Sequence, residues 1–184
     1  MQIIRRPWKL KRDDCPCDLH FVDWIADQNL RDQTIFHFGT GDHHLVGLAC
    51  ARSEAGHAVI GVTATPGEHD AYVKLAKADP EMTKRYVVHF GDIYNVNARL
   101  LPDLDIVTLF HLCEFADKSV TYRALNDESL VRMLGERLRP GGRMLFYTGS
   151  YAYAQAQPII EAWAAASDVT EVEVFKSLRV FRKA

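Results

Sequence analysis

Short apolar runs alternate along the chain with longer stretches that carry a helical period. The apolar runs predict five strands, at 34–40, 57–63, 85–92, 104–112 and 143–149. The stretches between and after them predict helices at 43–56, 67–79, 127–138 and 158–166. An alternation of strands and helices predicts a mostly parallel sheet with helices on both faces.

The end of the chain follows a different pattern. Residues 169–175 and 178–182 alternate between apolar and polar positions, and only Lys176 and Ser177 join the two segments. Strands with so short a connection must be antiparallel. We therefore predict an α/β fold with a doubly wound, seven-stranded and mostly parallel sheet that ends in a C-terminal antiparallel hairpin.

A further amphipathic helix is predicted at 17–30, ahead of the first strand. A basic stretch from Arg5 to Arg12 precedes this helix, and we expect it to form a solvated, partly ordered arm. The predicted organisation is a single domain, in which an N-terminal arm and helix at 1–33 precede an α/β unit at 34–184.

The composition is that of an ordinary soluble protein. The chain has 184 residues, of which 48% are hydrophobic and 25% charged, enough for one domain with a substantial core. The net charge of -2 gives no reason to expect a nucleic acid as partner. No apolar run follows the basic N-terminus, so we expect no signal peptide, no membrane span and a cytoplasmic location.

The cysteines and histidines match no known spacing of metal ligands. Cys15 and Cys17 form a C-P-C sequence rather than the C-x-x-C of common zinc and redox sites, and no second cysteine pair follows. We expect reduced thiols, with Cys50 and Cys113 as small core residues. Five histidines map to strands or strand ends: His37, His43, His44, His89 and His111. Their spacing also fits no metal motif, so we predict no metal.

The first strand ends in a glycine turn, Gly39-Thr40-Gly41. Glycine lets the backbone turn sharply and approach a ligand closely, and the start of the next helix offers free N–H groups. We expect Asp42 to cap that helix. The dinucleotide fingerprint G-x-G-x-x-G would need a third glycine where His44 stands, which disfavours a nicotinamide-dependent oxidoreductase.

Polar residues also follow the other predicted strands, at the edge where ligands bind in such sheets. Thr63 ends the second strand, and Glu68 either supplies a carboxylate nearby or lies in the first turn of the next helix. Asp92 follows the third strand, where it either accepts a hydrogen bond from an adenine amine or caps a turn. His111 and Glu114 follow the fourth strand, either as acid–base groups or as a pocket wall and a surface acid.

The order of these motifs resembles that of the class I S-adenosylmethionine-dependent methyltransferases. The likeness rests on "FHFGTG" at the first strand, "HFGDI" at the third, "LDIVTLFHL" at the fourth and "LVRMLGERLRPGGRMLF" before and through the fifth. The terminal hairpin resembles the reversed seventh strand of that family. The resemblance covers about residues 34–184, and it makes 17–30 the N-terminal helix that covers the cofactor.

The resemblance implies S-adenosylmethionine as cofactor and a set of contacts by position. These are His37, Gly39, Thr40, Gly41, Thr63, Asp92, Ile93, Phe110 and His111. The chain departs from the family at three of the motif positions. His37 replaces an acidic residue, His43 replaces the third glycine, and Thr63 replaces the acid that holds the ribose.

The implied function is methyl transfer from S-adenosylmethionine to a small-molecule acceptor. His111 is the first candidate for the general base and Glu114 the second, and Tyr147, Tyr151 and Tyr153 are candidates to line the acceptor pocket. The Asn/Asp-Pro-Pro-aromatic motif of base methyltransferases is absent, which disfavours nucleic acid. The alternative is a catalytically inactive, methyltransferase-like binding or interaction module with an altered cofactor site.

Overall fold

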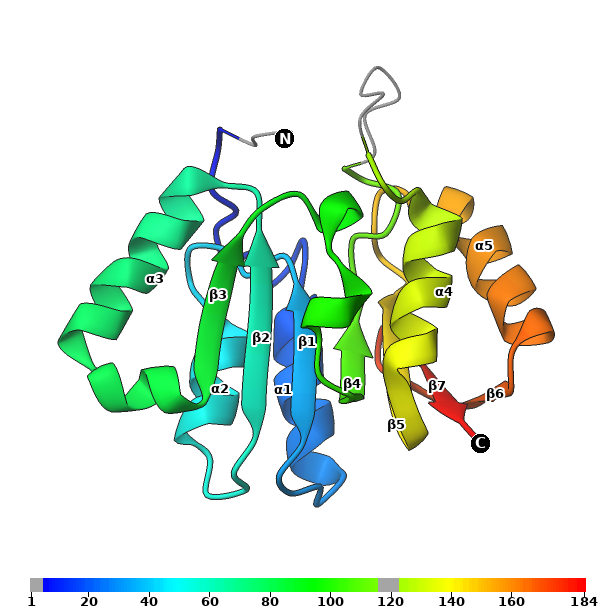
Figure 1. Cartoon of the computed structure of the whole chain (residues 1–184), viewed down its shortest axis with the longest axis horizontal. Helices are drawn as coiled ribbons and strands as arrows, with labels where there is room; N and C mark the ends of the chain where they lie inside the picture. The colour runs from blue at the N-terminus through cyan, green and yellow to red at the C-terminus, as the bar shows by residue number, and fades with distance from the viewer. Residues whose placement is uncertain (1–4, 116–122) are drawn as a thin grey trace.

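Seven strands form one sheet in the order β3-β2-β1-β4-β5-β7-β6 (Figure 1). The computed structural model describes residues 5–115 and 123–184, so residues 1–4 of the predicted arm lie outside the described residues. The strands are β1 (Thr34–Phe38), β2 (Ala58–Thr63), β3 (Tyr86–Phe90), β4 (Leu104–Thr108), β5 (Leu138–Tyr147), β6 (Val169–Phe175) and β7 (Leu178–Lys183). The first five are parallel, whereas β7 is antiparallel to both β5 and β6. The predicted sheet and its terminal hairpin are confirmed.

In the part of the chain that the structure describes, five α-helices and three short 3₁₀-helices accompany the strands. The α-helices are α1 (Cys17–Asp27), α2 (Leu45–Arg52), α3 (Pro66–Ala78), α4 (Asp127–Arg137) and α5 (Tyr153–Ala166). The 3₁₀-helices are η1 (Pro80–Lys84), η2 (Ile93–Asn95) and η3 (Ala98–Leu100). Within the described residues, no helix is long and apolar enough to cross a membrane.

The sheet buries both of its faces, because successive side chains of a strand point in opposite directions. In β1, Ile35 packs into the cluster formed with α1 and α2, and Phe36 packs into the cluster formed with α4 and α5. Both side chains are fully buried. Helices therefore cover both faces of the sheet, and they leave the carboxyl ends of the strands uncovered.

Helix α1 belongs to the core of the domain. Phe21 and Trp24 are fully buried in the cluster on the α1 and α2 face. The indole N–H of Trp24 also donates to Glu173 of β6 over 2.7 Å, and His20 lies 2.6 Å from the hydroxyl of Ser177. The helix at 17–30 was expected to cover the cofactor, but its apolar face instead packs against the sheet.

Several predicted ends of helices and strands were wrong, because contacts with other parts of the fold outweighed the local sequence pattern. Helix α2 begins at Leu45 and ends at Arg52, since Ser53 is already extended and Gly56 turns the chain with φ +81°. Strand β4 ends at Thr108 instead of 112. Helix α5 begins at Tyr153, so Pro158 lies inside the helix and not at its start.

Candidate functional site

A pocket opens where the parallel strands β1, β2, β3 and β4 end. The N-terminal segment runs past these strand ends (Figure 1). Its volume is about 680 Å³ when the space open to solvent is included. The strand order reverses between β1 and β4, which is the point where ligands bind in doubly wound sheets.

The pocket brings together most of the residues that the sequence singled out. Those that line it are Gly39, Gly41, Thr63, Asp92, Ile93, His111 and Glu114. Three further predicted residues, His37, Thr40 and Phe110, are not among the described residues that line it. Each of these three is only 1% exposed, because its side chain lies in the interior beneath the pocket.

Both glycines of the turn after β1 adopt left-handed backbone conformations. Gly39 has φ +85° and Gly41 has φ +57°, values that side chains other than glycine rarely adopt. The N–H of Gly39 donates to the carbonyl of Val62 over 3.1 Å, which ties the turn to β2. A Cβ atom on Gly39 would lie 3.8 Å from the ring of His111. The two glycines therefore keep the floor of the pocket free of side chains.

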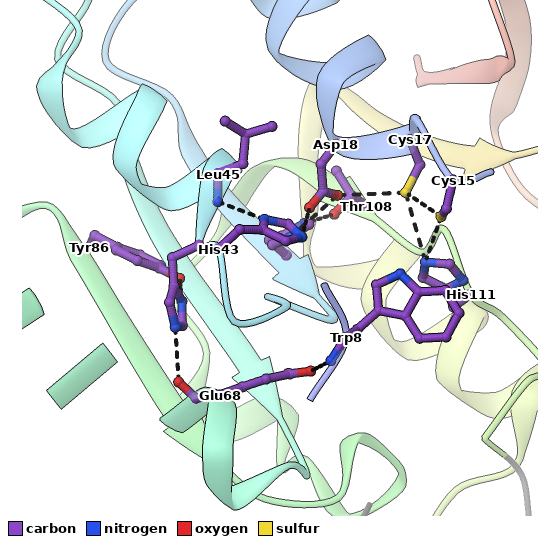
Figure 2. A network of polar contacts seen from close by, with 12 residues as sticks. Trp8, Cys15, Cys17, Asp18, His43, Leu45, Glu68, Tyr86, Thr108 and His111 are labelled. Atoms are coloured by element: carbon purple, nitrogen blue, oxygen red, sulfur yellow. Dashed lines mark hydrogen bonds and ion pairs between the residues drawn. The ribbon is translucent and has the colours of Figure 1, made fainter. Parts of the chain in front are cut away.

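The two histidines that follow the turn have different roles. His44 is 1% exposed and stands directly before α2 with φ +48°. Its Nε2–H donates to the carbonyl of Glu68 over 2.9 Å, and its Nδ1 accepts from the hydroxyl of Tyr86 over 2.7 Å. His43 instead places Nε2 3.8 Å from a carboxylate oxygen of Asp18. The expected Asp42 cap is not formed, since Nδ1 of His43 accepts from the N–H of Leu45, the first residue of α2, over 3.2 Å (Figure 2).

Replacing His44 by alanine is expected to destabilise the protein by about 2 kcal/mol. The change leaves the buried Tyr86 hydroxyl without its partner and puts alanine at a positive φ. His44→Gly loses the same hydrogen bonds but relieves the backbone, so it should be about 0.5–1 kcal/mol more stable than His44→Ala. Urea unfolding measures both values, and equal stability of wild type and His44→Ala would contradict the structural role.

His37 is buried next to the pocket floor. Its Nδ1 lies 2.7 Å from the hydroxyl of Thr108, and its Nε2 has no hydrogen-bond partner among the described residues. Nε2 is 3.9 Å from the carboxylate of Asp18, which is itself 5% exposed. Burial lowers the pKa of His37 to about 3 and raises that of Asp18 to about 7. His37 is therefore neutral at ordinary pH, unlike the acidic residue it replaces in the motif.

Glu68 provides the carboxylate that the end of β2 lacks. It lies in the first turn of α3 and also lines the pocket, so both roles considered for it occur together. One oxygen accepts from the hydroxyl of Thr63 over 2.6 Å. The other accepts from the N–H of Trp8 over 2.8 Å, as Figure 2 shows. Burial raises its pKa, against the effect of these two donors.

The basic N-terminal segment is held against the pocket at Trp8. Besides the bond to Glu68, the carbonyl of Trp8 accepts from the N–H of Asp42 over 2.9 Å. Arg6 and Trp8 both line the pocket. Most of the residues from Arg5 to Arg12 are exposed, as expected of a solvated arm, and the two hydrogen bonds tie the segment at Trp8. The element that reaches over the pocket is this segment, because α1 is occupied by packing on the sheet.

Asp92 caps a turn, which is one of the two roles that the sequence left open, and it also lies at the pocket. Its carboxylate accepts from the N–H of Tyr94 over 3.1 Å and so caps η2, and the residue also lines the pocket. The second oxygen lies 3.4 Å from Nε of Arg123, and both side chains are largely buried. The guanidinium of Arg123 also stacks 4.6 Å from the ring of Tyr94. These contacts fix the carboxylate at the end of β3.

His111 and Glu114 form an ion pair on the opposite wall. Nδ1 of His111 lies 3.1 Å from Oε1 of Glu114, which also accepts from the hydroxyl of Ser150 over 2.5 Å and the N–H of Tyr151 over 3.1 Å. Burial alone would lower the pKa of His111, but Cys15 and Glu114 outweigh it and raise this pKa to about 10. A raised pKa disfavours the predicted role of His111 as a general base.

The remaining pocket residues could not be picked out from the sequence. They are Arg6, Trp8, Phe38, Ala64, Thr65 and Phe115. Phe38, Ala64 and Thr65 lie at or next to strand ends, whereas nothing in the sequence signalled Arg6 and Trp8. The three tyrosines proposed for an acceptor pocket do not line this one. Tyr147 is buried in the core, Tyr151 is 83% exposed, and the hydroxyl of Tyr153 accepts from Arg179.

Comparisons with known proteins identify the fold. No protein-family model matches the chain, and no curated protein matches its sequence. The solved structure of the CcbJ methyltransferase from Streptomyces caelestis has a TM-score of 0.66 and 15% identity, and the match covers 96% of this chain and 93% of that one. The cyclase SpnF has a TM-score of 0.61 and 16% identity, with 94% and 65% covered.

A third structure was determined with ligands bound. Coclaurine N-methyltransferase in complex with N-methylheliamine and S-adenosylhomocysteine has a TM-score of 0.53 and 15% identity, with 77% of this chain and 40% of that one covered. The chain thus spans less than two thirds of the length of this enzyme and of the cyclase. The chain has the fold of the class I S-adenosylmethionine-dependent methyltransferases, as its motif order indicated.

Proposed function

We propose that the protein binds S-adenosylmethionine in this pocket and transfers its methyl group to a small molecule. The observation that carries the proposal is the pocket itself. Six of the nine residues that match cofactor-contact positions of the family line one cavity at the switch point of the sheet. The chain is structurally similar to a cyclase as well as to methyltransferases. Because the fold does not specify the reaction, the experiment must test the reaction itself.

For each portion of the cofactor, the pocket has residues of a suitable chemical type. Gly39 and Gly41 leave room for close approach of the amino-acid portion to the backbone. The carboxylate of Glu68, reached through Thr63, takes the ribose position that the sequence left without an acid. Asp92, held by its cap and by Arg123, lies at the adenine position. When bound, the cofactor supplies a sulfonium methyl that needs no further activation.

The protein's own contribution is to position the acceptor and to exclude water. His111 and Glu114 face the pocket from the end of β4 and remain the candidates for contact with the acceptor. The pocket lining is largely apolar, with Phe38 and Phe115 meeting edge to face at 5.7 Å. A small molecule with an apolar body fits this lining better than a nucleic acid does, because the chain has no basic excess.

Titration with S-adenosylhomocysteine tests cofactor binding before any acceptor is known. At a concentration of 100 times Kd, the ligand should stabilise the fold by about 2.7 kcal/mol and raise the melting temperature accordingly. Calorimetry should give one site per chain. NADH serves as the matched control and should cause no shift. No shift and no heat with millimolar S-adenosylhomocysteine would contradict the proposal and favour a binding module without the cofactor.

A further inference from the structure

Two cysteines and a histidine that are far apart in the sequence meet beside the pocket. Cys15 and Cys17 lie at the start of α1, and His111 follows β4, 94 positions after Cys17. The two Sγ atoms are 3.5 Å apart, and each lies 3.8 Å from Nε2 of His111 (Figure 2). The three ligand atoms therefore form a nearly equilateral triangle.

We propose that Cys15, Cys17 and His111 bind one Zn²⁺ ion. In tetrahedral zinc sites, Zn–S bonds of about 2.3 Å and Zn–N bonds of about 2.0–2.1 Å place two sulfurs about 3.8 Å apart and a sulfur and a nitrogen about 3.5 Å apart. The observed separations, 3.5 Å between the sulfurs and 3.8 Å from each sulfur to Nε2, lie within about 0.3 Å of these values. Two sulfurs and one imidazole nitrogen suit Zn²⁺, whereas Mg²⁺ and Ca²⁺ prefer oxygen ligands.

The backbone and the burial of the cluster also suit a metal site. Cys15 is held by a bond from its N–H to the carbonyl of Lys11 over 2.9 Å, and Pro16 leads directly into α1, which Cys17 begins. Both cysteines are less than 9% exposed, and both are free thiols. The side chain of His111 is 12% exposed. Little rearrangement is needed to bring the three atoms onto one ion.

The surroundings of His111 resemble the outer shell of histidine metal ligands. Such histidines place their second ring nitrogen against a carboxylate or carbonyl, which orients the ring. Here Nδ1 is 3.1 Å from Glu114, and that carboxylate is fixed by Ser150 and the N–H of Tyr151. Nε2 is thereby directed toward the two sulfurs.

The site has three protein ligands and one open position. Among the described residues, the group contains just these three ligand atoms within 4.8 Å of one another. A tetrahedral ion would take a fourth ligand, either water or an atom of a molecule in the adjacent pocket, which His111 also lines. Three protein ligands with an open position are typical of catalytic rather than structural zinc sites.

Metal titration of the reduced, full-length chain tests the proposal without the methyl donor, so failure of cofactor binding and failure of zinc binding are distinguishable. After treatment with a chelator, the protein should bind one Zn²⁺ per chain. Co²⁺ should give the intense near-ultraviolet absorption of thiolate ligands. Cys15→Ser, Cys17→Ser and His111→Asn should each weaken Zn²⁺ binding by at least about 100-fold. The matched control, Cys113→Ser, should bind as the wild type does.

A second measurement needs no variant. Bound Zn²⁺ should protect Cys15 and Cys17 of the wild type from alkylation by iodoacetamide, while Cys113 reacts at the same rate with and without the ion. Absence of Co²⁺–thiolate absorption, or equal alkylation of the two cysteines with and without Zn²⁺, would overturn the proposal. A disulfide between Cys15 and Cys17 that persists in reductant would also overturn it, since zinc requires both thiolates.

Discussion

With tryptophan in place of Gly39, affinity for S-adenosylhomocysteine is expected to fall by at least about 100-fold, or about 2.7 kcal/mol. Gly39 lines the pocket, and a Cβ atom at this position would meet only the ring of His111, at 3.8 Å. A side chain therefore has room at this position, although the positive φ strains the backbone, and the indole would occupy the space where the cofactor is proposed to bind. Calorimetric titration measures the loss.

Gly141→Trp is a matched control for the backbone strain that Gly39→Trp introduces. Gly141 also adopts a positive φ, +78° against +85° for Gly39, and a Cβ there would likewise have its nearest contact at 3.8 Å, with the side chain of Arg182. Gly141→Trp should lose a similar 1–2 kcal/mol of stability, about the cost of a left-handed residue, but keep its affinity for the ligand. Similar affinities of the two variants would show that the ligand does not use this pocket.

Acidification is expected to destabilise the wild type more than His37→Gln, by about 3 kcal/mol between pH 7.5 and pH 4.5. Burial holds the pKa of folded His37 at about 3, whereas the unfolded chain has an ordinary histidine pKa of about 6.5. Between these values the unfolded state binds the additional proton. The stability contributed by a neutral His37 is therefore complete above about pH 6.5 and is lost as the pH falls toward 3.

Glutamine is close in size to histidine and retains a group that can pair with Thr108, so His37→Gln removes the titration with little change of packing. Urea unfolding across the pH range measures the difference. Other titrating groups, including Asp18, His43 and His44, are present in both proteins. His89→Gln is the matched control, since His89 is exposed on β3, and it should follow the wild-type profile. Parallel profiles of wild type and His37→Gln would contradict the assignment.

The sheet and the place of the pocket follow from the sequence alone. Apolar runs and helical periods are local patterns, and their alternation leaves a mostly parallel sheet as the favoured arrangement. The residue after each strand then lies at one shared edge. This is why Gly39, Thr63, Asp92 and His111 could be placed together before any contact was known, and why the pocket contains all four.

The direction of each side chain could not be predicted in the same way. His37, Thr40 and Phe110 were expected among the cofactor contacts, but the pleat of the strands and the packing of α1 turn them into the interior. The same packing explains why the helix at 17–30 does not reach over the pocket. It buries Phe21 and Trp24 against the sheet, a gain that depends on the strands being assembled.

Only the tertiary structure decided which distant residues meet. The bond between Trp8 and Glu68 spans 60 positions, and the cluster of Cys15, Cys17 and His111 joins the start of α1 to the end of β4. The C-P-C spacing alone predicted no metal, because the proposed third ligand, His111, lies in the segment that follows β4. A local pattern specifies the conformation of neighbours in the chain, whereas contacts between separate segments depend on how the helices and strands pack.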